Sequence, residues 1–165
     1  MNHLIISCIG PDRSGLVDTL SKIIKKHQGN WQVSSLHHLS GFFAGVIEVA
    51  VSKDNTRLLT EDLSTITDLH CKIELAKPNI IPLNDMLMLD LTANDRAGIV
   101  QEISSVIHHQ GGNLIKLIST PSSAAHTGQV IFTAKAQIAI NNESVEHLVE
   151  ALEQIADDLM VDITR

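Results

Sequence analysis

Two segments of the chain carry nearly the same polar signature, in which an aspartate and an arginine stand shortly before a glycine and two aliphatic residues. The first reads Gly10-Pro11-Asp12-Arg13-Ser14-Gly15-Leu16-Val17, and the second reads Asn94-Asp95-Arg96-Ala97-Gly98-Ile99-Val100. In the first copy, Arg13 can attract a carboxylate and Asp12 can meet an ammonium group. A ligand that matches both charges is a zwitterionic amino acid.

The glycines of this signature fit a ligand site, but they also fit a purely structural role. Gly10 and Gly15 permit a tight backbone and the close approach of a ligand. The helix expected to follow offers free N–H groups and a partial positive charge to a carboxylate. Alternatively, Asp12 caps the helix and Gly15 only lets helix and sheet pack closely. The second copy, with Gly98, does not decide between these, because a shared fold would keep the same cap.

Two asparagines occupy matching places further along. Asn30 and Asn113 each follow a glycine where a helix is expected to turn into a strand. Each is either a polar turn residue or an amide that reaches a ligand from the next strand. The candidate ligand-binding residues are therefore Gly10, Asp12, Arg13, Gly15, Asn30, Asp95, Arg96, Gly98 and Asn113.

Nothing in the sequence argues for catalysis, a metal or a cofactor. The chain has no Gly-x-Ser-x-Gly, no phosphate-binding Gly-Lys-Ser/Thr and no Gly-x-Gly-x-x-Gly after a strand. Among the nine histidines, the adjacent pairs His37-His38 and His108-His109 diverge on a strand or a helix and lack zinc-site spacing. We therefore predict no enzyme, no catalytic residue and no metal.

Composition narrows the partners and the compartment. The net charge of −7 argues against direct nucleic-acid binding, which normally uses a basic face. No apolar run reaches the length of a membrane helix, and the opening is too short for a signal peptide, so we expect a cytoplasmic protein without a membrane partner. Cys8 and Cys71 lie in apolar stretches without metal spacing and are expected to be buried, reduced thiols.

Each half of the chain predicts the order strand, helix, strand, strand, helix, strand. In the first half we expect strands over 4–9, 31–39, 42–52 and 70–77, and helices over 14–28 and around 58–66. In the second half we expect strands over 86–92, 114–121, 129–140 and 159–163, and helices over 98–109 and 145–155. Gly29 is expected to stop the first helix, and Asp54 or Asn55 to cap the second.

The helices should each bury one apolar stripe against a sheet. The expected inward residues are Leu16, Val17, Leu20, Ile23 and Ile24, then Leu58, Leu59, Leu63 and Ile66, and in the second half Ile99, Val100, Ile103, Val106 and Ile107. The fold class is thus α+β, with two ferredoxin-like βαββαβ domains in tandem. We place the first domain over 1–80 and the second over 85–165, with 81–84 as the end of a proline-containing linker that begins at 77.

The signature Gly-x-Asp-Arg-x-Gly-Leu/Ile-Val in a βαββαβ unit resembles the ACT domain, a small regulatory module of amino-acid metabolism. Gly10–Val17 matches fully, whereas the second copy has Ala93-Asn94 in place of Gly-Pro but keeps Asp95, Arg96 and Gly98. Two such modules, spanning about 3–164, fill the chain. A free-standing tandem of this kind resembles the glycine cleavage system transcriptional repressor family.

This resemblance implies a non-enzymatic co-repressor that contacts a DNA-binding transcriptional activator of the glycine cleavage operon, with a small amino acid, glycine, as effector and without another cofactor. The two loops would flank a pocket at a domain or subunit interface, and a homo-oligomer is compatible with this. The main alternative is an amino-acid-sensing regulatory subunit that binds a metabolic enzyme directly. A structural dimerisation module without a ligand and an enzyme are further alternatives.

Overall fold

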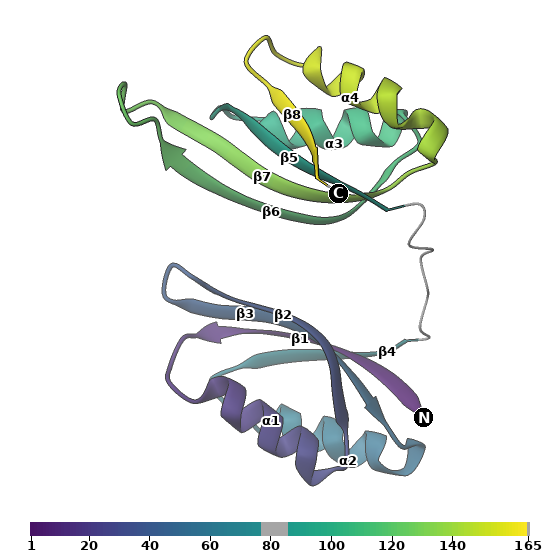
Figure 1. Cartoon of the computed structure of the whole chain (residues 1–165). Helices are drawn as coiled ribbons and strands as arrows, with labels where there is room; N and C mark the ends of the chain where they lie inside the picture. Colours follow the sequence, from purple (N-terminus) through teal and green to yellow (C-terminus); the bar gives the residue numbers. More distant parts are fainter. Residues whose placement is uncertain (77–85, 165) are drawn as a thin grey trace. The chain divides into compact units, whose positions relative to one another are not determined.

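The chain divides into two compact units, Met1–Asn79 and Ile80–Arg165 (Figure 1). The computed structural model describes residues 1–76 and 86–164. The linker predicted over 77–84 therefore lies outside the described residues.

The first domain is a four-stranded antiparallel sheet with two helices on one face (Figure 1). Its elements are β1 (Asn2–Pro11), α1 (Leu16–Lys26), β2 (Asn30–Leu39), β3 (Phe42–Val51), α2 (Lys53–Ser64) and β4 (His70–Ala76). The strand order is β2-β3-β1-β4, so β1 lies between β3 and β4.

The second domain repeats this topology, with strand order β6-β7-β5-β8. Its elements are β5 (Met86–Asn94), α3 (Ile99–His109), β6 (Asn113–Ser123), β7 (Val130–Ala139), the short 3-10 helix η2 (Asn142–Ser144), α4 (Val145–Glu153) and β8 (Met160–Thr164). Both helices again cover one face of the sheet (Figure 1). The predicted α+β class, with two ferredoxin-like βαββαβ domains, is confirmed.

The expected helix stripes form most of the helix side of each core. Leu16, Leu20 and Ile24 are buried in the first domain, and their counterparts Ile99, Ile103 and Ile107 are buried in the second. These side chains pack against the apolar side chains of the sheet. Ile23 and Val106 pack at the edge of the two cores and are partly buried.

Three residues of the predicted stripes are instead exposed. Val17 and Val100 are 44% and 42% exposed, and Leu58 is 42% exposed. Val17 and Val100 each directly follow a buried residue, and one step along a helix rotates the side chain by about 100° away from the core. Leu58 likewise precedes the buried Leu59. The width of each stripe was therefore overestimated by one residue.

The helix ends also differ from the prediction. Helix α1 spans Leu16–Lys26 rather than 14–28, and the left-handed residue after it is Gln28, with φ of 57°, rather than Gly29. Gly29 serves packing, because a Cβ there would lie 2.9 Å from Ile24 Cγ2. Helix α2 is capped by Ser52, whose side chain accepts a hydrogen bond from the Asn55 backbone N–H, and not by Asp54 or Asn55.

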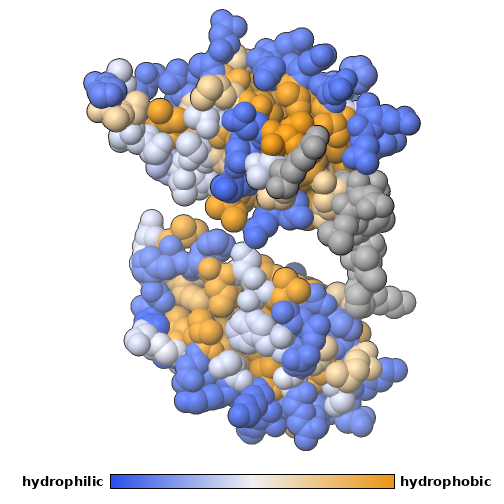
Figure 2. Space-filling view, viewed as in Figure 1, coloured by the Kyte–Doolittle hydropathy of each residue, from blue (hydrophilic) through white to orange (hydrophobic). Residues whose placement is uncertain are grey.

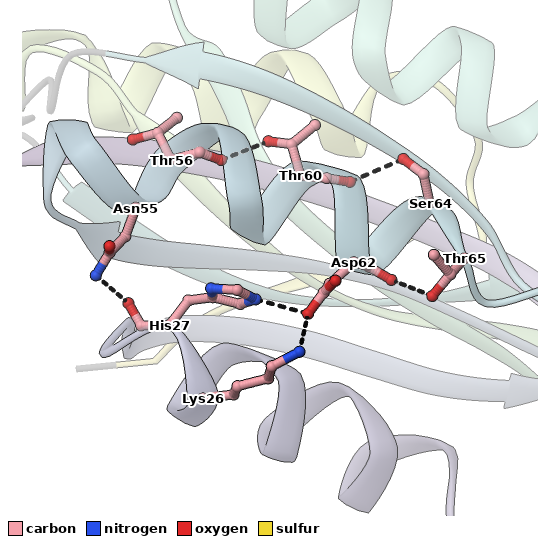
Figure 3. A network of polar contacts seen from close by, with 8 residues as sticks. All are labelled: Lys26, His27, Asn55, Thr56, Thr60, Asp62, Ser64 and Thr65. Atoms are coloured by element: carbon pink, nitrogen blue, oxygen red, sulfur yellow. Dashed lines mark hydrogen bonds and ion pairs between the residues drawn. The ribbon is translucent and has the colours of Figure 1, made fainter.

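A polar network joins α1 to α2 (Figure 3). Asp62 Oδ2, on α2, accepts hydrogen bonds from Lys26 Nζ at 2.6 Å and His27 Nε2 at 2.7 Å. Asn55 Nδ2 donates to the His27 backbone oxygen at 2.9 Å. The His27 ring is buried, so its hydrogen bond to Asp62 satisfies a polar group that would otherwise destabilise the fold. The network fixes the C-terminal end of α1 against α2.

Candidate functional site

Each copy of the polar signature forms the loop from the first strand of its domain to the first helix. Gly15 precedes α1 with φ of 85°, and Gly98 precedes α3 with φ of 88°. Neither helix start has a side-chain cap. The first backbone N–H groups of both helices are thus unoccupied by capping side chains, which suits an anionic group.

The glycines at the helix starts are required by conformation rather than by packing. A Cβ on Gly15 would meet no atom within 4 Å, and one on Gly98 would meet only Glu102 Oε1 at 3.9 Å. Their left-handed backbone is what favours glycine. The alternative in which Gly15 only allows helix and sheet to pack closely is therefore wrong.

Gly10 has a different role from Gly15. A Cβ on Gly10 would lie 2.2 Å from the backbone oxygen of Asp68, which precedes β4. Gly10 therefore lets the end of β1 approach the segment that leads into β4. The second domain has the buried Ala93 at the matching position, so this close approach is particular to the first domain.

Asp12 does not cap α1, in contrast to one of the alternatives above. Its Oδ2 accepts a hydrogen bond from His38 Nδ1, in β2, at 2.5 Å. Its backbone N–H donates to the Gly41 oxygen in the β2–β3 turn at 2.9 Å. In the second domain the Asp95 N–H donates to the Val130 oxygen at 3.0 Å. Each loop is thus tied to the neighbouring hairpin.

The two arginines have different surroundings. Arg13 Nε lies 3.3 Å from Asp68 Oδ2, with both side chains about half exposed. Arg96 donates from Nη1 and Nη2 to the two carboxylate oxygens of Glu102, at 2.7 and 2.6 Å. The hydrogen bonds from Arg96 hold the pKa of Glu102 below its ordinary value, because they stabilise the charged carboxylate.

Glu102 places a carboxylate in the first turn of α3, where a bound ligand's carboxylate would interact favourably with the helix N-terminus. The first domain has Thr19 at the matching position, and its hydroxyl donates to the Gly15 oxygen at 3.0 Å. In the first loop the helix start is uncapped, and Thr19 offers no carboxylate to Arg13. In the second loop Arg96 is already bound to the carboxylate of Glu102.

The structure does not bring Asn30 or Asn113 to the loop of its own domain. Asn30 lies opposite Ala50, which lies opposite His3 near the start of β1, whereas Gly10 stands near the end of that strand. A strand rises about 3.3 Å per residue, so the part of β1 near Asn30 lies more than about 20 Å from Gly10. Asn113 likewise pairs with Ala139, opposite Met86 at the start of β5.

Several side chains that contact the loops were not singled out from the sequence. Among them are His38, which binds Asp12; Asp68, which meets Arg13 and Gly10; Glu102, which binds Arg96; and Asp158, which accepts a hydrogen bond from the Asn94 backbone N–H at 2.7 Å. Of these residues, only Glu102 could have been noticed in the sequence, because the first copy has Thr19 at the matching position. His38 and Asp68 are brought to the loop by the pairing of strands that are distant in sequence.

The open face of the first sheet, on the side away from α1 and α2, carries exposed apolar side chains. Ile9, Leu39, Phe42 and Val46 are between 47% and 63% exposed. In β1 and β3 they stand next to buried residues such as Cys8, Phe43 and Ile47, whereas β2 has no buried residue. Figure 2 shows apolar residues at the surface of this domain among polar ones. Such a surface suits contact with another protein.

Within residues 1–76 and 86–164, no three His, Cys, Asp or Glu side chains are grouped so that they could hold a metal ion. No helix in the described part of the chain is both long and apolar enough to cross a membrane.

Comparison with solved structures shows likeness along the whole chain. An unknown protein from Galdieria sulphuraria is 22% identical with a TM-score of 0.84, over 98% of this chain and 96% of that one. A candidate glycine cleavage system transcriptional repressor is 14% identical with a TM-score of 0.72, over 99% and 96%. A scan of known protein families finds no match. A search of curated proteins finds none either. This likeness and the strand topology show that the chain has the expected fold, two βαββαβ domains in tandem.

Proposed function

We propose that the protein is a non-enzymatic regulator that responds to a small amino acid through the loop Gly10–Gly15. One observation carries this proposal: the uncapped start of α1, the guanidinium of Arg13 and the carboxylate of Asp12 lie within one short turn. Backbone N–H groups and Arg13 can bind a carboxylate, and Asp12 can bind an ammonium group. The geometry thus offers both charges of a zwitterion.

Binding at this loop has competitors within the domain. Arg13 must exchange its single contact with Asp68 for the ligand, and Asp12 must share its carboxylate between the ligand and His38. Both pairs are at least partly exposed, so exchanging them has a small energetic cost. The open space around Gly15 leaves room for a ligand against the backbone.

We further propose that the regulated process is transcription of the glycine cleavage system, with glycine as effector. The net charge of −7 disfavours direct DNA binding, so the protein would act by contacting a DNA-binding activator. Support comes from the full-length likeness to a candidate repressor of that system and from the loop signature. The apolar open face of the first sheet is a suitable contact surface.

The ligand part of the proposal is tested by thermal unfolding in the presence of glycine, alanine and serine, because a ligand that binds only the folded state raises the melting temperature. Glycolate, which lacks the ammonium group, and glycinamide, which lacks the carboxylate, test each charge separately. Glycine should raise the melting temperature, and each analogue should raise it less. Equal shifts with glycolate would exclude Asp12 as the ammonium partner.

A matched control removes an arginine outside the loop. Arg57, on α2, pairs with Glu61 at the surface, so Arg57→Ala should keep the full response to glycine. Arg13→Ala should lose it. If no amino acid shifts the melting temperature, the protein is not a sensor and the structural dimerisation module becomes the better account.

The partner part is tested by adding the protein to an activator bound to operator DNA and following the complex by gel shift, with and without glycine. Formation or disruption of a joint complex supports the co-repressor. Recovery of a metabolic enzyme, with no effect on the activator, supports the amino-acid-sensing regulatory subunit instead.

A further inference from the structure

The two cysteines of the chain lie side by side on neighbouring strands of the first sheet. Cys8 on β1 lies directly opposite Cys71 on the antiparallel neighbour β4. Their sulfur atoms are 3.2 Å apart, and both thiols are free. Cys8 is part of the domain core and Cys71 packs against it. The sequence predicted two buried thiols, and it did not predict that they would be in contact.

Strand pairing has already brought the two residues to a separation that suits a disulfide. Directly opposite residues of an antiparallel pair have Cα atoms about 4.5–5.5 Å apart. Disulfides join Cα atoms about 4.4–6.8 Å apart, with sulfurs about 2.05 Å apart. The sulfurs therefore need to move closer by about 1 Å, which side-chain rotation can supply without a shift of the strands.

The two thiols have different reactivity. The two thiols are within hydrogen-bond distance of each other, and this contact lowers the pKa of the Cys71 thiol below its ordinary value. The same contact, together with burial, raises the pKa of Cys8. Cys71 is therefore the nucleophile of the pair, since thiolates react and thiols do not.

Cys71 can also be reached by a small molecule. It lies on β4, an edge strand, and is only partly buried. The Cys8 and Cys71 side chains point to the helix side of the sheet, whereas those of their strand neighbours Ser7, Ile9, His70 and Lys72 point to the other face. The Cys71 sulfur is therefore approached along the sheet edge at β4, which admits a small oxidant such as hydrogen peroxide, whereas a protein thiol of another molecule cannot approach Cys8 in the core.

We propose that Cys8 and Cys71 form a reversible disulfide within the first domain when the protein meets a peroxide. The Cys71 thiolate attacks one peroxide oxygen, the O–O bond breaks, and a sulfenic acid and hydroxide are formed. The Cys8 sulfur then attacks the sulfenic sulfur, the S–O bond breaks, and water leaves with the Cys8 proton. The hydroxide from the first step takes up the proton that Cys71 released and becomes a second water. In total, the two thiols lose two electrons and one hydrogen peroxide is reduced to two waters.

The second domain shows that the fold does not need cysteines at these positions. There, Leu91 on β5 lies opposite Val161 on β8, in the same register. An apolar pair thus fills the matching place in the same topology. It also indicates a control substitution, Cys71→Val, that keeps an apolar side chain on β4 and removes the nucleophile.

The disulfide would lie beside the candidate ligand loop. Gly10, two residues after Cys8, packs on the backbone of Asp68, three residues before Cys71, and Arg13 meets the Asp68 carboxylate. A bond between Cys8 and Cys71 would restrain both segments. We expect oxidation to change the melting-temperature response to glycine, and this expectation alone rests on the proposed function.

The test treats the full reduced chain with hydrogen peroxide, quenches with catalase and alkylates all free thiols after denaturation. The proposal requires loss of both alkylatable thiols, a mass about 2 Da below the reduced chain, a monomer on a non-reducing gel and recovery of both thiols with dithiothreitol. Peptide mapping should find Cys8 linked to Cys71. None of these measurements depends on an amino-acid ligand, so their failure is distinct from failure of the proposed function.

Cys71→Val provides the matched comparison, with its fold checked by circular dichroism. Its single thiol, Cys8, should stay alkylatable under conditions that oxidise the native chain, because it is buried and has lost its nucleophilic partner. Native protein that keeps both thiols, forms disulfide-linked dimers or goes to sulfinic acid would overturn the proposal. So would equally rapid loss of Cys8 in the variant.

Discussion

Arg96 and Glu102 form a bidentate ion pair at the start of α3, with N–O distances of 2.7 and 2.6 Å. The matching arginine of the first domain, Arg13, has a single contact of 3.3 Å with Asp68. A planar guanidinium that already binds a carboxylate through two parallel hydrogen bonds is poorly available to another. The two copies of the loop are therefore similar in sequence but differ in their readiness to bind a ligand.

Arg13→Ala and Arg96→Ala should accordingly have unequal effects on ligand binding. Arg13→Ala removes a charge-assisted hydrogen bond to the ligand carboxylate, which is about 1.5–3 kcal/mol, so glycine should bind at least about tenfold more weakly. Arg96→Ala should leave the main binding event nearly unchanged. Calorimetric titration of both variants and of the double variant measures this. Equal losses in the two single variants would show that the loops act together.

Neither substitution should unfold the protein. Both arginines are exposed by more than a third, and exposed ion pairs contribute little to stability because solvent screens them. Urea unfolding of the same two variants serves as the control, and a large loss of stability would invalidate the binding comparison.

Glu102→Thr should make the second loop resemble the first, because Thr19 occupies the matching position there. The substitution removes the carboxylate that holds Arg96 and leaves the left-handed Gly98 in place. We expect a second glycine-binding event in the calorimetric titration, which Arg96→Ala should then abolish. An unchanged single event in the Glu102→Thr variant would show that Glu102 does not block the second loop.

The structure explains why the framework could be predicted and the site only in part. The buried positions of α1 and α3 follow from a 3.6-residue period, which local sequence carries. The distance between Asn30 and Gly10 follows from topology: a helix that crosses back over the sheet delivers the chain to the start of β1, not to its end. The βαββαβ order already implied this, and the grouping of Asn30 with the loop overlooked it.

Contacts between side chains that are distant in the sequence could not be predicted. The pairing of Asp12 with His38 depends on the register of β2 with β3, and that of Arg13 with Asp68 on the approach of β4 to β1. The alternation of apolar and polar residues along a strand predicts which face of the sheet each side chain is on. It does not predict which residue of the neighbouring strand lies opposite. The contact between Cys8 and Cys71 was missed for the same reason.

Gly10→Ala and Gly15→Ala should destabilise the first domain for different reasons. The added methyl of Gly10→Ala would meet the Asp68 backbone oxygen at 2.2 Å, so the strands must shift, at a cost of about 1–3 kcal/mol. Gly15→Ala meets no atom but must adopt φ of 85°, which costs about 1 kcal/mol. Urea midpoints measure both, and Gly98→Ala is the matched control for Gly15→Ala. A neutral Gly10→Ala would contradict the close packing.

Acid should weaken the link between α1 and α2. Hydrogen bonds from Lys26, and then from His27, lower the pKa of Asp62 below its ordinary value of 3.8. A carboxyl with a lowered folded-state pKa contributes stability that is fully present above the unfolded value and is lost as the pH falls through the folded value. Native protein should thus be more stable than Asp62→Asn at pH 6, and the difference should shrink below about pH 4.

Urea unfolding between about pH 6 and pH 2.5 measures this difference, with Glu61→Gln, an adjacent exposed carboxylate paired with Arg57, as the comparison. A difference between native protein and Asp62→Asn that stays constant over this range would show that the charge of Asp62 does not matter to the network in Figure 3.

The purified protein should not shift operator DNA by itself at physiological salt. With 12 Lys and Arg against 19 Asp and Glu, the chain lacks the excess positive charge that normally neutralises phosphates. Seven basic side chains of the described structure are already paired with carboxylates, namely Arg13, Lys22, Lys26, Arg57, Lys72, Arg96 and Lys135. A gel shift appearing only when a DNA-binding activator is added would support the co-repressor. A salt-sensitive complex of this protein alone with duplex DNA would show that it binds nucleic acid directly, and the activator would then be unnecessary.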